Sequence, residues 1–247
     1  MGRQDAVYRR RHMERTSLTF REESPSDAEP HLRADTPRRQ YDSDAYSLLA
    51  RLGKKVTFKA KQQIFGRGDR ASTLLGIQSG VVISYRTTSS GRRAITTMYR
   101  ASDLLGLNSA DHHSAACEAA TRVHAFVVSR DTIMSMAQHD PRVARGLLAV
   151  SINQSGRGED RIELFATTAT ERVCSFILRM AAQTNRGEFA DLPMRRQDIA
   201  DYLGLTTETV CRTITQLRTS RVIRLETVRR AQILNRNSLE RMSGASI

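Results

Sequence analysis

The sequence predicts an α+β chain with three parts: an N-terminal β-roll, a long helix and a C-terminal winged helix-turn-helix domain. Short β-type runs separated by turn residues occupy residues 55–130, as in small antiparallel barrels and sandwiches. Apolar residues at helical spacing follow from about Asp140 to Phe165. Residues 195–217 then combine two short amphipathic stretches around a glycine, which is the pattern of a helix-turn-helix. These three observations predict the fold class.

The expected domain boundaries follow from changes in composition along the chain. Residues 1–40 are polar, carry charges of both signs and contain several prolines, so we expect a mobile tail that packs against nothing. The roll is expected to span residues 41–137, the long helix residues 138–167 and the winged helix-turn-helix domain residues 168–247.

Within the roll, the expected strands are rich in β-branched and aromatic residues, for example VVISYRTT, AITTMYR and RVHAFVVS. Turn signals such as Gly68-Asp69 and Ser79-Gly80 separate the runs at intervals of about ten residues. This even spacing predicts antiparallel pairing of neighbouring strands.

Pro141 is expected in the first turn of the long helix, where the missing N–H is tolerated. Apolar residues near both of its ends predict a dimer seam, which needs apolar a and d positions. Its middle carries Gly156 and Gly158, each costing about 1 kcal/mol relative to alanine in a helix. These glycines either weaken the seam or permit a close crossing with a partner helix. The candidate dimer-interface residues are Leu147, Val150, Gln154, Gly158, Ile162 and Phe165.

The C-terminal domain is expected to start with an amphipathic helix over residues 169–183, whose apolar face holds Val173, Phe176, Ile177 and Met180. In the motif that follows, Gly204 provides the positive-φ corner between two helices, and Thr206 or Thr207 provides the capping oxygen for the second. The expected inward residues of the motif are Ile199, Ala200, Leu203, Leu205, Val210, Ile214 and Leu217.

The second helix of the motif presents polar residues outward at its beginning. A helix that enters the major groove uses such residues to meet base edges, with arginine on guanine and glutamate on the amino group of cytosine. The alternative is a solvated helical hairpin in an ordinary bundle. The candidate DNA-binding residues are Thr207, Glu208, Thr209, Cys211, Arg212, Arg195 and Arg196.

After the motif, residues 222–235 predict a β-hairpin with Arg229 and Arg230 near its tip, which is the wing of a winged helix. The stretch NSLERM then predicts a short closing helix. The formal net charge of +13 fits a polyanionic partner such as DNA, although RNA or a membrane surface would also suit it.

Composition also excludes several classes of protein. The chain has no apolar run long enough to cross a membrane and no apolar segment of a secretory signal. Its three cysteines are far apart, which argues against a disulfide framework and suits a reducing cytoplasm. A glycine-rich phosphate loop, a nucleophile–base pair and a metal-ligand cluster are all missing from the sequence, so we do not expect an enzyme.

The order of β-roll, long helix and winged helix-turn-helix over residues 45–242 resembles the CRP/FNR superfamily of bacterial transcription regulators. IFGRGDRASTLLGIQSGVVISY and GRRAITTMYRASDLLGL resemble the family's repeated glycine pattern. ATERV and LPMRRQDIADYLGLTTETVCRTITQL are similar to its FixK-like branch. The resemblance implies that Glu208 and Arg212 read the G·C pair of a TTGAT-type half-site, with Thr207 beside a thymine. Cys211 and Thr213 depart from the pattern, which usually has a serine and a branched aliphatic residue there.

The effectors known in this superfamily each need their own chemistry. An FNR-type iron–sulfur cluster needs cysteines near the N-terminus, whereas the first cysteine here is Cys117. Cyclic nucleotide binding in the family uses a Gly-Glu pair and a downstream arginine. In the equivalent stretch, DLLGLNSADHHSAACEAAT, Gly106 is followed by leucine, and no arginine lies between Gly106 and Ser114. We interpret His112 and His113 as surface residues rather than haem or metal ligands, and we expect no cofactor.

The resemblance predicts a cytoplasmic, dimeric, FixK-like activator that binds palindromic double-stranded DNA, contacts RNA polymerase and does not involve a membrane. Its genes would serve low-oxygen metabolism or nitrogen fixation. The alternative is an effector-gated or redox-gated member of the superfamily, switched through the roll or through Cys211. Cys117 and Cys174 are expected in the core, whereas Cys211 lies near Arg212 and a helix N-terminus, where a thiol can be reactive. The simpler interpretation is that Cys211 only replaces a small serine.

Overall fold

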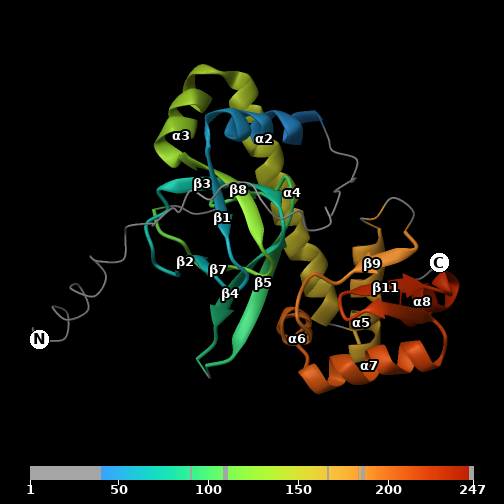
Figure 1. Cartoon of the computed structure of the whole chain (residues 1–247). Coiled ribbons are helices and arrows are strands. Elements are labelled where there is room, and N and C mark those ends of the chain that lie inside the picture. The colour runs from blue at the N-terminus through green and yellow to red at the C-terminus, as the bar shows by residue number, and fades with distance from the viewer. Residues whose placement is uncertain are drawn as a thin grey trace, which may run out of the picture.

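A computed structural model describes residues 40–89, 91–107, 111–165, 167–182, 184 and 187–244. For residues 40–45 and 155–165 it describes the backbone alone. The chain forms a β-roll, a long helix beside it and a C-terminal domain of helices and a small sheet (Figure 1). This confirms the predicted α+β fold class. The predicted tail lies outside the described residues, except for Gln40.

The roll consists of two four-stranded antiparallel sheets, ordered β1-β8-β3-β6 and β2-β7-β4-β5. Residues from both sheets form a common apolar core, which includes Phe58, Ile77, Val82 and Val123. The turn before β4 needs Gly80, because its φ is +88° and a Cβ there would lie 2.1 Å from the Arg122 carbonyl oxygen. The strands are β1 Lys54–Phe58, β2 Gln63–Phe65, β3 Thr73–Ser79, β4 Val82–Thr87, β5 Arg93–Tyr99, β6 Leu104–Leu105, β7 Ala116–Ala119 and β8 Val123–Ser129.

Two helices that the sequence pattern did not predict flank the roll: α2 (Gln40–Leu52) and α3 (Arg130–His139). Both pack against the long helix α4 (Pro141–Phe165), whose first turn contains Pro141 as expected. They close a second apolar core between the roll and α4. Its buried residues are Leu49, Leu74, Leu104, Val128, Ile133, Val143, Leu147 and Val150.

This second core corrects the predicted dimer seam. Leu147 and Val150 are buried within their own protomer, and the buried Gln154 donates a hydrogen bond of 2.6 Å from Nε2 to the Leu104 carbonyl oxygen. A seam through these three residues is therefore wrong, because α2 and the roll already cover that face. The side chains of Gly158, Ile162 and Phe165 lie outside the described residues. Among the α4 side chains that the structure describes, the large apolar ones that are exposed are Leu148, 60% exposed, and Ile152, 62% exposed.

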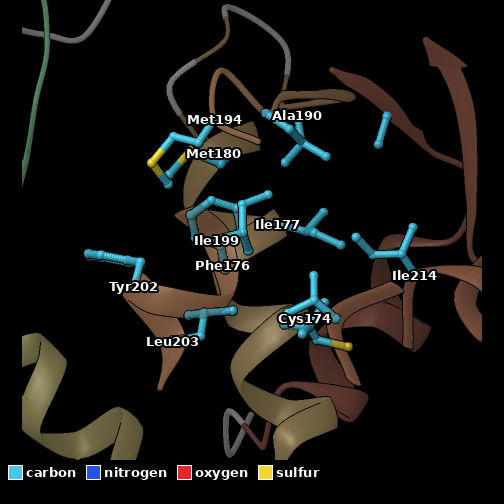
Figure 2. Close-up of a cluster of buried hydrophobic side chains, with 14 of the residues drawn as sticks. Cys174, Phe176, Ile177, Met180, Ala190, Met194, Ile199, Tyr202, Leu203 and Ile214 are labelled. Atoms are coloured by element: carbon cyan, nitrogen blue, oxygen red, sulfur yellow. The ribbon is translucent and has the colours of Figure 1, made fainter. Parts of the chain in front are cut away.

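The C-terminal domain packs three helices and a short fourth around a three-stranded sheet of order β10-β11-β9. Figure 2 shows Phe176, Ile177 and Ile199 inside its apolar cluster, with Tyr202 on one side and Ile214 on the other. The elements are α5 Ala169–Ala181, β9 Phe189–Asp191, α6 Arg196–Leu203, α7 Thr207–Thr219, β10 Ile223–Thr227, β11 Arg230–Ile233 and α8 Arg236–Met242.

The entry into this domain is fixed by a capping box at the start of α5. The Thr168 hydroxyl accepts a hydrogen bond from the Glu171 backbone N–H, and the Glu171 carboxylate accepts one from the Thr168 N–H at 2.6 Å. These hydrogen bonds hold the pKa of Glu171 below its usual range. The strand β9 was not predicted. It pairs with β11 and extends the predicted hairpin into a sheet.

Candidate nucleic-acid interface

The helix α7 has one buried face and one exposed face. Its buried residues are Val210, Thr213, Ile214 and Leu217. They pack against α5 and α6, so the helix is held in place by its own domain. The exposed face begins with Glu208 and continues through Cys211 and Arg212. The residues of α7 that were predicted to face inward are therefore buried, and the predicted outward residues Glu208, Cys211 and Arg212 are exposed.

Glu208 and Arg212 form an ion pair one helical turn apart, in which Arg212 Nη2 donates to Glu208 Oε1. Their side chains are 77% and 74% exposed. An ion pair this exposed contributes little to stability. Its effect is on orientation, because each side chain holds the polar end of the other on the outer face of α7. Both groups remain accessible to a ligand.

The start of α7 is held by threonine hydroxyls. Of the two predicted capping residues, Thr206 and Thr207, the N-cap is Thr206. Its Oγ1 accepts a hydrogen bond of 3.1 Å from the Thr209 backbone N–H. The Thr207 hydroxyl donates to Gln197 Oε1 at 2.6 Å, and Gln197 Nε2 donates to Asp201 Oδ1 at 2.9 Å. The hydroxyl of Thr207 is thus engaged with α6, and its methyl group takes no part in that bond.

The turn before α7 has the predicted geometry. Gly204 adopts φ +66°, and its N–H bonds to the Ala200 carbonyl. Thr213, which departs from the family pattern, is buried with its hydroxyl donating to the Thr209 carbonyl oxygen at 3.0 Å. An internal bond of this kind removes the cost of burying the hydroxyl. Threonine therefore fits where an aliphatic residue is more usual.

The two arginines predicted at the start of α6 have different environments. Arg195 donates from Nε and Nη2 to both carboxylate oxygens of the buried Asp198, at 2.9 Å each. Its side chain is 43% exposed. Arg196 is half-buried, and its Nη1 has no hydrogen-bond partner among the described residues. Burial lowers the pKa of Arg196, and the nearby Cys211 opposes that shift. Arg195 is therefore more accessible to a phosphate than Arg196.

The three cysteines also differ in exposure. Cys117 and Cys174 are buried, as predicted, and Cys211 is exposed on α7. Burial raises the pKa of the Cys117 thiol to about 12 and that of Cys174 to about 11. Both thiols are therefore protonated at neutral pH and poorly reactive.

The wing adds an arginine that was not among the candidate DNA-binding residues. Arg229 is exposed in the turn between β10 and β11. Arg230 instead folds back over the ring of Phe189, 4.5 Å from its centroid, and lies 3.8 Å from carboxylate oxygens of Asp191 and Glu226. The position of Arg229 near a hairpin tip was predictable from the sequence, whereas the packing of Arg230 on Phe189 was not.

A partly open cavity of about 70 Å³ lies between the roll and α4. The prediction that both adjacent histidines lie on the surface is wrong for His113. His113 is 4% exposed and stacks on Phe65 with ring centroids 3.5 Å apart, whereas His112 is exposed. Burial lowers the pKa of His113. The described residues that line the cavity include no arginine or lysine: Phe65, Ser84, Tyr99, Leu105, Gly106, His113, Ser114, Ala115, Cys117 and Gln154.

Among the described residues, no three His, Cys, Asp or Glu side chains are grouped so that they could hold a metal ion. No described helix is long and apolar enough to span a membrane.

Comparison with known proteins matches both halves of the chain. Residues 171–242 match the Crp-like helix-turn-helix domain, and residues 55–140 match the cyclic nucleotide-binding domain. The nitrogen fixation regulation protein FixK of Azorhizobium caulinodans is 34% identical over 201 residues, covering 79% of this chain and 81% of FixK. FixK of Rhizobium meliloti is 30% identical, covering 74% and 84%. The structure of FixK2 from Bradyrhizobium japonicum superposes with a TM-score of 0.74 at 32% identity, covering 79% of this chain and all of FixK2.

Proposed function

Because the chain belongs to the FixK-like branch of the CRP/FNR superfamily and is a DNA-binding transcription regulator, we propose that it reads a TTGAT-type palindrome as a homodimer. Each protomer places α7 in a major groove, and the two grooves lie about one DNA turn apart. In this role the protein activates genes of low-oxygen metabolism or nitrogen fixation, with RNA polymerase as its partner. Its site of action is the cytoplasm, where the chromosome lies.

The observation that carries this proposal is the exposed Glu208–Arg212 pair on α7. Arginine can donate two hydrogen bonds to guanine, and glutamate can accept one from the amino group of cytosine. Neighbouring Thr207 can place its methyl group against the methyl group of a thymine. Thr209, Cys211 and Arg195 complete the proposed contact surface. Arg196 is left out because it is half-buried.

The proposed dimer uses the exposed apolar residues Leu148 and Ile152 of α4. A second copy of the same helix would cover both of them across a two-fold axis. The seam predicted through Leu147 and Val150 is replaced by this neighbouring face.

A direct binding measurement tests the proposal. Fluorescence anisotropy should give tight binding to a duplex with two inverted TTGAT half-sites and markedly weaker binding when the G·C pair is changed in both halves. Separating the half-sites by about five extra base pairs, half a DNA turn, should also weaken binding because one reading helix then faces the wrong side. Equal affinity for all three duplexes would contradict the proposal.

We do not assign an effector to the roll. A cyclic nucleotide carries a phosphate that needs a cation when buried, and the described lining of the cavity contains neither arginine nor lysine. The cavity of about 70 Å³ is also smaller than the roughly 300 Å³ at the low end of ligand pockets. Control through synthesis of the protein itself agrees with these observations.

A redox-gated activity is the second candidate, and the exposure of Cys211 favours it. Peroxide would oxidise its thiolate to a sulfenic acid, and further oxidation to a sulfinate would place negative charge against DNA phosphates. We expect peroxide to weaken operator binding by the parent, thiol reductant to restore the sulfenic fraction, and Cys211→Ser to bind DNA without responding. If both proteins respond equally, Cys211 only replaces a small residue.

A further inference from the structure

Two consecutive arginines of the roll reach across to the first helix of the helix-turn-helix. Arg92 Nη2 donates a hydrogen bond of 2.9 Å to the Leu205 carbonyl oxygen, just beyond the C-terminal end of α6. Arg93 Nη1 lies 3.6 Å from Asp198 Oδ1, in the N-terminal turn of α6. The strand β5, which begins at Arg93, runs beside α6 (Figure 1). The roll therefore contacts α6 at both ends.

The acceptor at the N-terminal end is a buried carboxylate shared by both domains. Asp198 is 1% exposed. Its oxygens accept from the guanidinium of Arg195 in its own domain, and they also face Arg93 of the roll. A buried carboxylate needs cationic partners, and here one of the two comes from another domain. The N-terminal turn of α6 is thus electrostatically linked to the roll.

The Arg93 guanidinium lies beside an aromatic ring and a carboxylate of the roll. Its guanidinium carbon lies 4.0 Å from the centroid of the Tyr85 ring, and its Nη2 lies 3.4 Å from Glu118 Oε1 on β7. Its Nε and Nη2 are buried without a hydrogen-bond partner among the described residues. Arg93 therefore lies between a carboxylate of the roll and a carboxylate of α6.

The two domains also share an apolar contact, and Arg100 Nη2 of the roll donates a hydrogen bond of 3.3 Å to Met180 Sδ of α5. Val81, Ile83, Ile95 and Met98 of the roll belong to the same buried cluster as Ile199 of α6. Apolar contact is non-directional, so it holds the two surfaces together without fixing their relative orientation. Charged and hydrogen-bonded groups fix the register of such an interface. Arg92 and Arg93 supply these groups at two separate points, which together define the direction of the α6 axis.

We propose that Arg92 and Arg93 are positioning residues, which hold α6, and with it α7, in one orientation on the roll before DNA binds. This inference rests on the proposed reading of DNA by α7. The two arginines contact the ends of α6 and leave Glu208 and Arg212 exposed. The orientation that they hold is thus one in which the reading face is presented. A domain that loses this constraint spends less time in the competent orientation, and its apparent Kd rises in proportion.

The first test measures the affinity of the full chain carrying Arg92→Met and Arg93→Met for the TTGAT palindrome. Methionine keeps a long side chain and removes the guanidinium. We expect Kd to rise about tenfold, as it does when the competent fraction falls to about one tenth. The matched control is Arg86→Met, which removes an exposed arginine from the neighbouring strand β4. An equal loss in the control would overturn the proposal, because it would show a general effect of charge.

The salt dependence of binding separates positioning from direct contact with DNA. A phosphate contact contributes about one to the slope of log K against log salt concentration. A positioning pair leaves that slope at the parental value while Kd rises. A slope reduced by about two in the double variant would mean that the arginines touch phosphates, and the proposal would be wrong.

Hydrogen exchange without DNA provides a readout that does not depend on the operator. Backbone amides of α6 and of residues 204–209 should exchange faster in the double variant than in the parent or in Arg86→Met. If the parent fails to bind TTGAT but this difference appears, the proposed operator is wrong and the positioning role stands. Parental exchange in the variant would overturn the positioning role. Arg92→Met alone, which removes a bond to a backbone carbonyl, keeps the test decisive if the double variant does not fold.

Discussion

The helices α7 and α4 are both amphipathic, yet their exposed faces differ in character. α7 buries an apolar face and exposes Glu208 and Arg212, which are charged. α4 buries one apolar face against its own roll and still exposes Leu148 and Ile152. An exposed polar face suits a polar ligand such as DNA, whereas adjacent exposed apolar residues indicate contact with another protein. The difference supports the proposal that α7 reads DNA and that α4 forms the dimer seam.

The largest effect that we expect from this comparison is on the dimer. Leu148→Asp would place a carboxylate in the proposed apolar seam, and burying an unpaired charge costs several kcal/mol. We expect the dimer dissociation constant to rise by about 100-fold or more, which corresponds to about 2.7 kcal/mol. Analytical ultracentrifugation measures it. Leu52→Asp changes another exposed leucine, on α2, and should leave the dimer intact. A parental dimer in Leu148→Asp would show that this face of α4 is not the seam.

A smaller effect is expected at the start of α7. Thr206→Ala removes the oxygen that accepts the Thr209 N–H, and loss of an N-cap costs about 1 kcal/mol. The free energy of unfolding, measured with urea, should fall by that amount. Thr215→Ala, in the exposed interior of the same helix, should be neutral or slightly stabilising. If the two variants are equally stable, the cap contributes nothing to holding the reading helix.

The smallest effect concerns pH and the cavity beside the buried face of α4. Burial holds the pKa of His113 below its ordinary value of 6.5, so the unfolded chain binds more protons than the folded one below that pH. The stabilisation is therefore complete above pH 6.5 and is lost as pH falls through the lowered pKa of the folded protein. Unfolding measured from pH 7 to pH 5 should show a shallower decline in His113→Gln than in the parent. His112→Gln, at the exposed neighbouring residue, should retain the parental decline. A parental decline in His113→Gln as well would contradict this role of His113.

The helices α7 and α4 also show which buried faces a sequence pattern can predict and which it cannot. The inward residues of α7 were predictable because its packing partners, α5 and α6, are adjacent in the chain and carry a recognisable motif. On α4, apolar residues occupy two adjoining faces, and the pattern alone did not show which one the protomer buries. That choice is made by α2 and the roll, and α2 was not predicted. Leu147, Val150 and Gln154 of the predicted interface therefore lie on the face that the protomer itself buries.

Other differences have the same physical origin in contacts between distant parts of the chain. His113 is buried because it stacks on Phe65. Arg196 is half-buried by the packing around α6. Spacing within one segment carries no information on either contact. The corner at Gly204 and the polar face of α7 were predictable because backbone geometry and helical phase determine them locally.

Selection of half-sites from randomised duplexes, followed by sequencing, tests most directly that Glu208 and Arg212 read the G·C pair. The parent should enrich TTGAT with that pair fixed. Arg212→Ala and Glu208→Ala should each relax the preference at that pair by about one to two decades, since a good base contact is worth about 1–3 kcal/mol, and they should retain the flanking preferences. Selection of the same sequence by the parent and both variants would contradict the assignment of α7 as the reading helix.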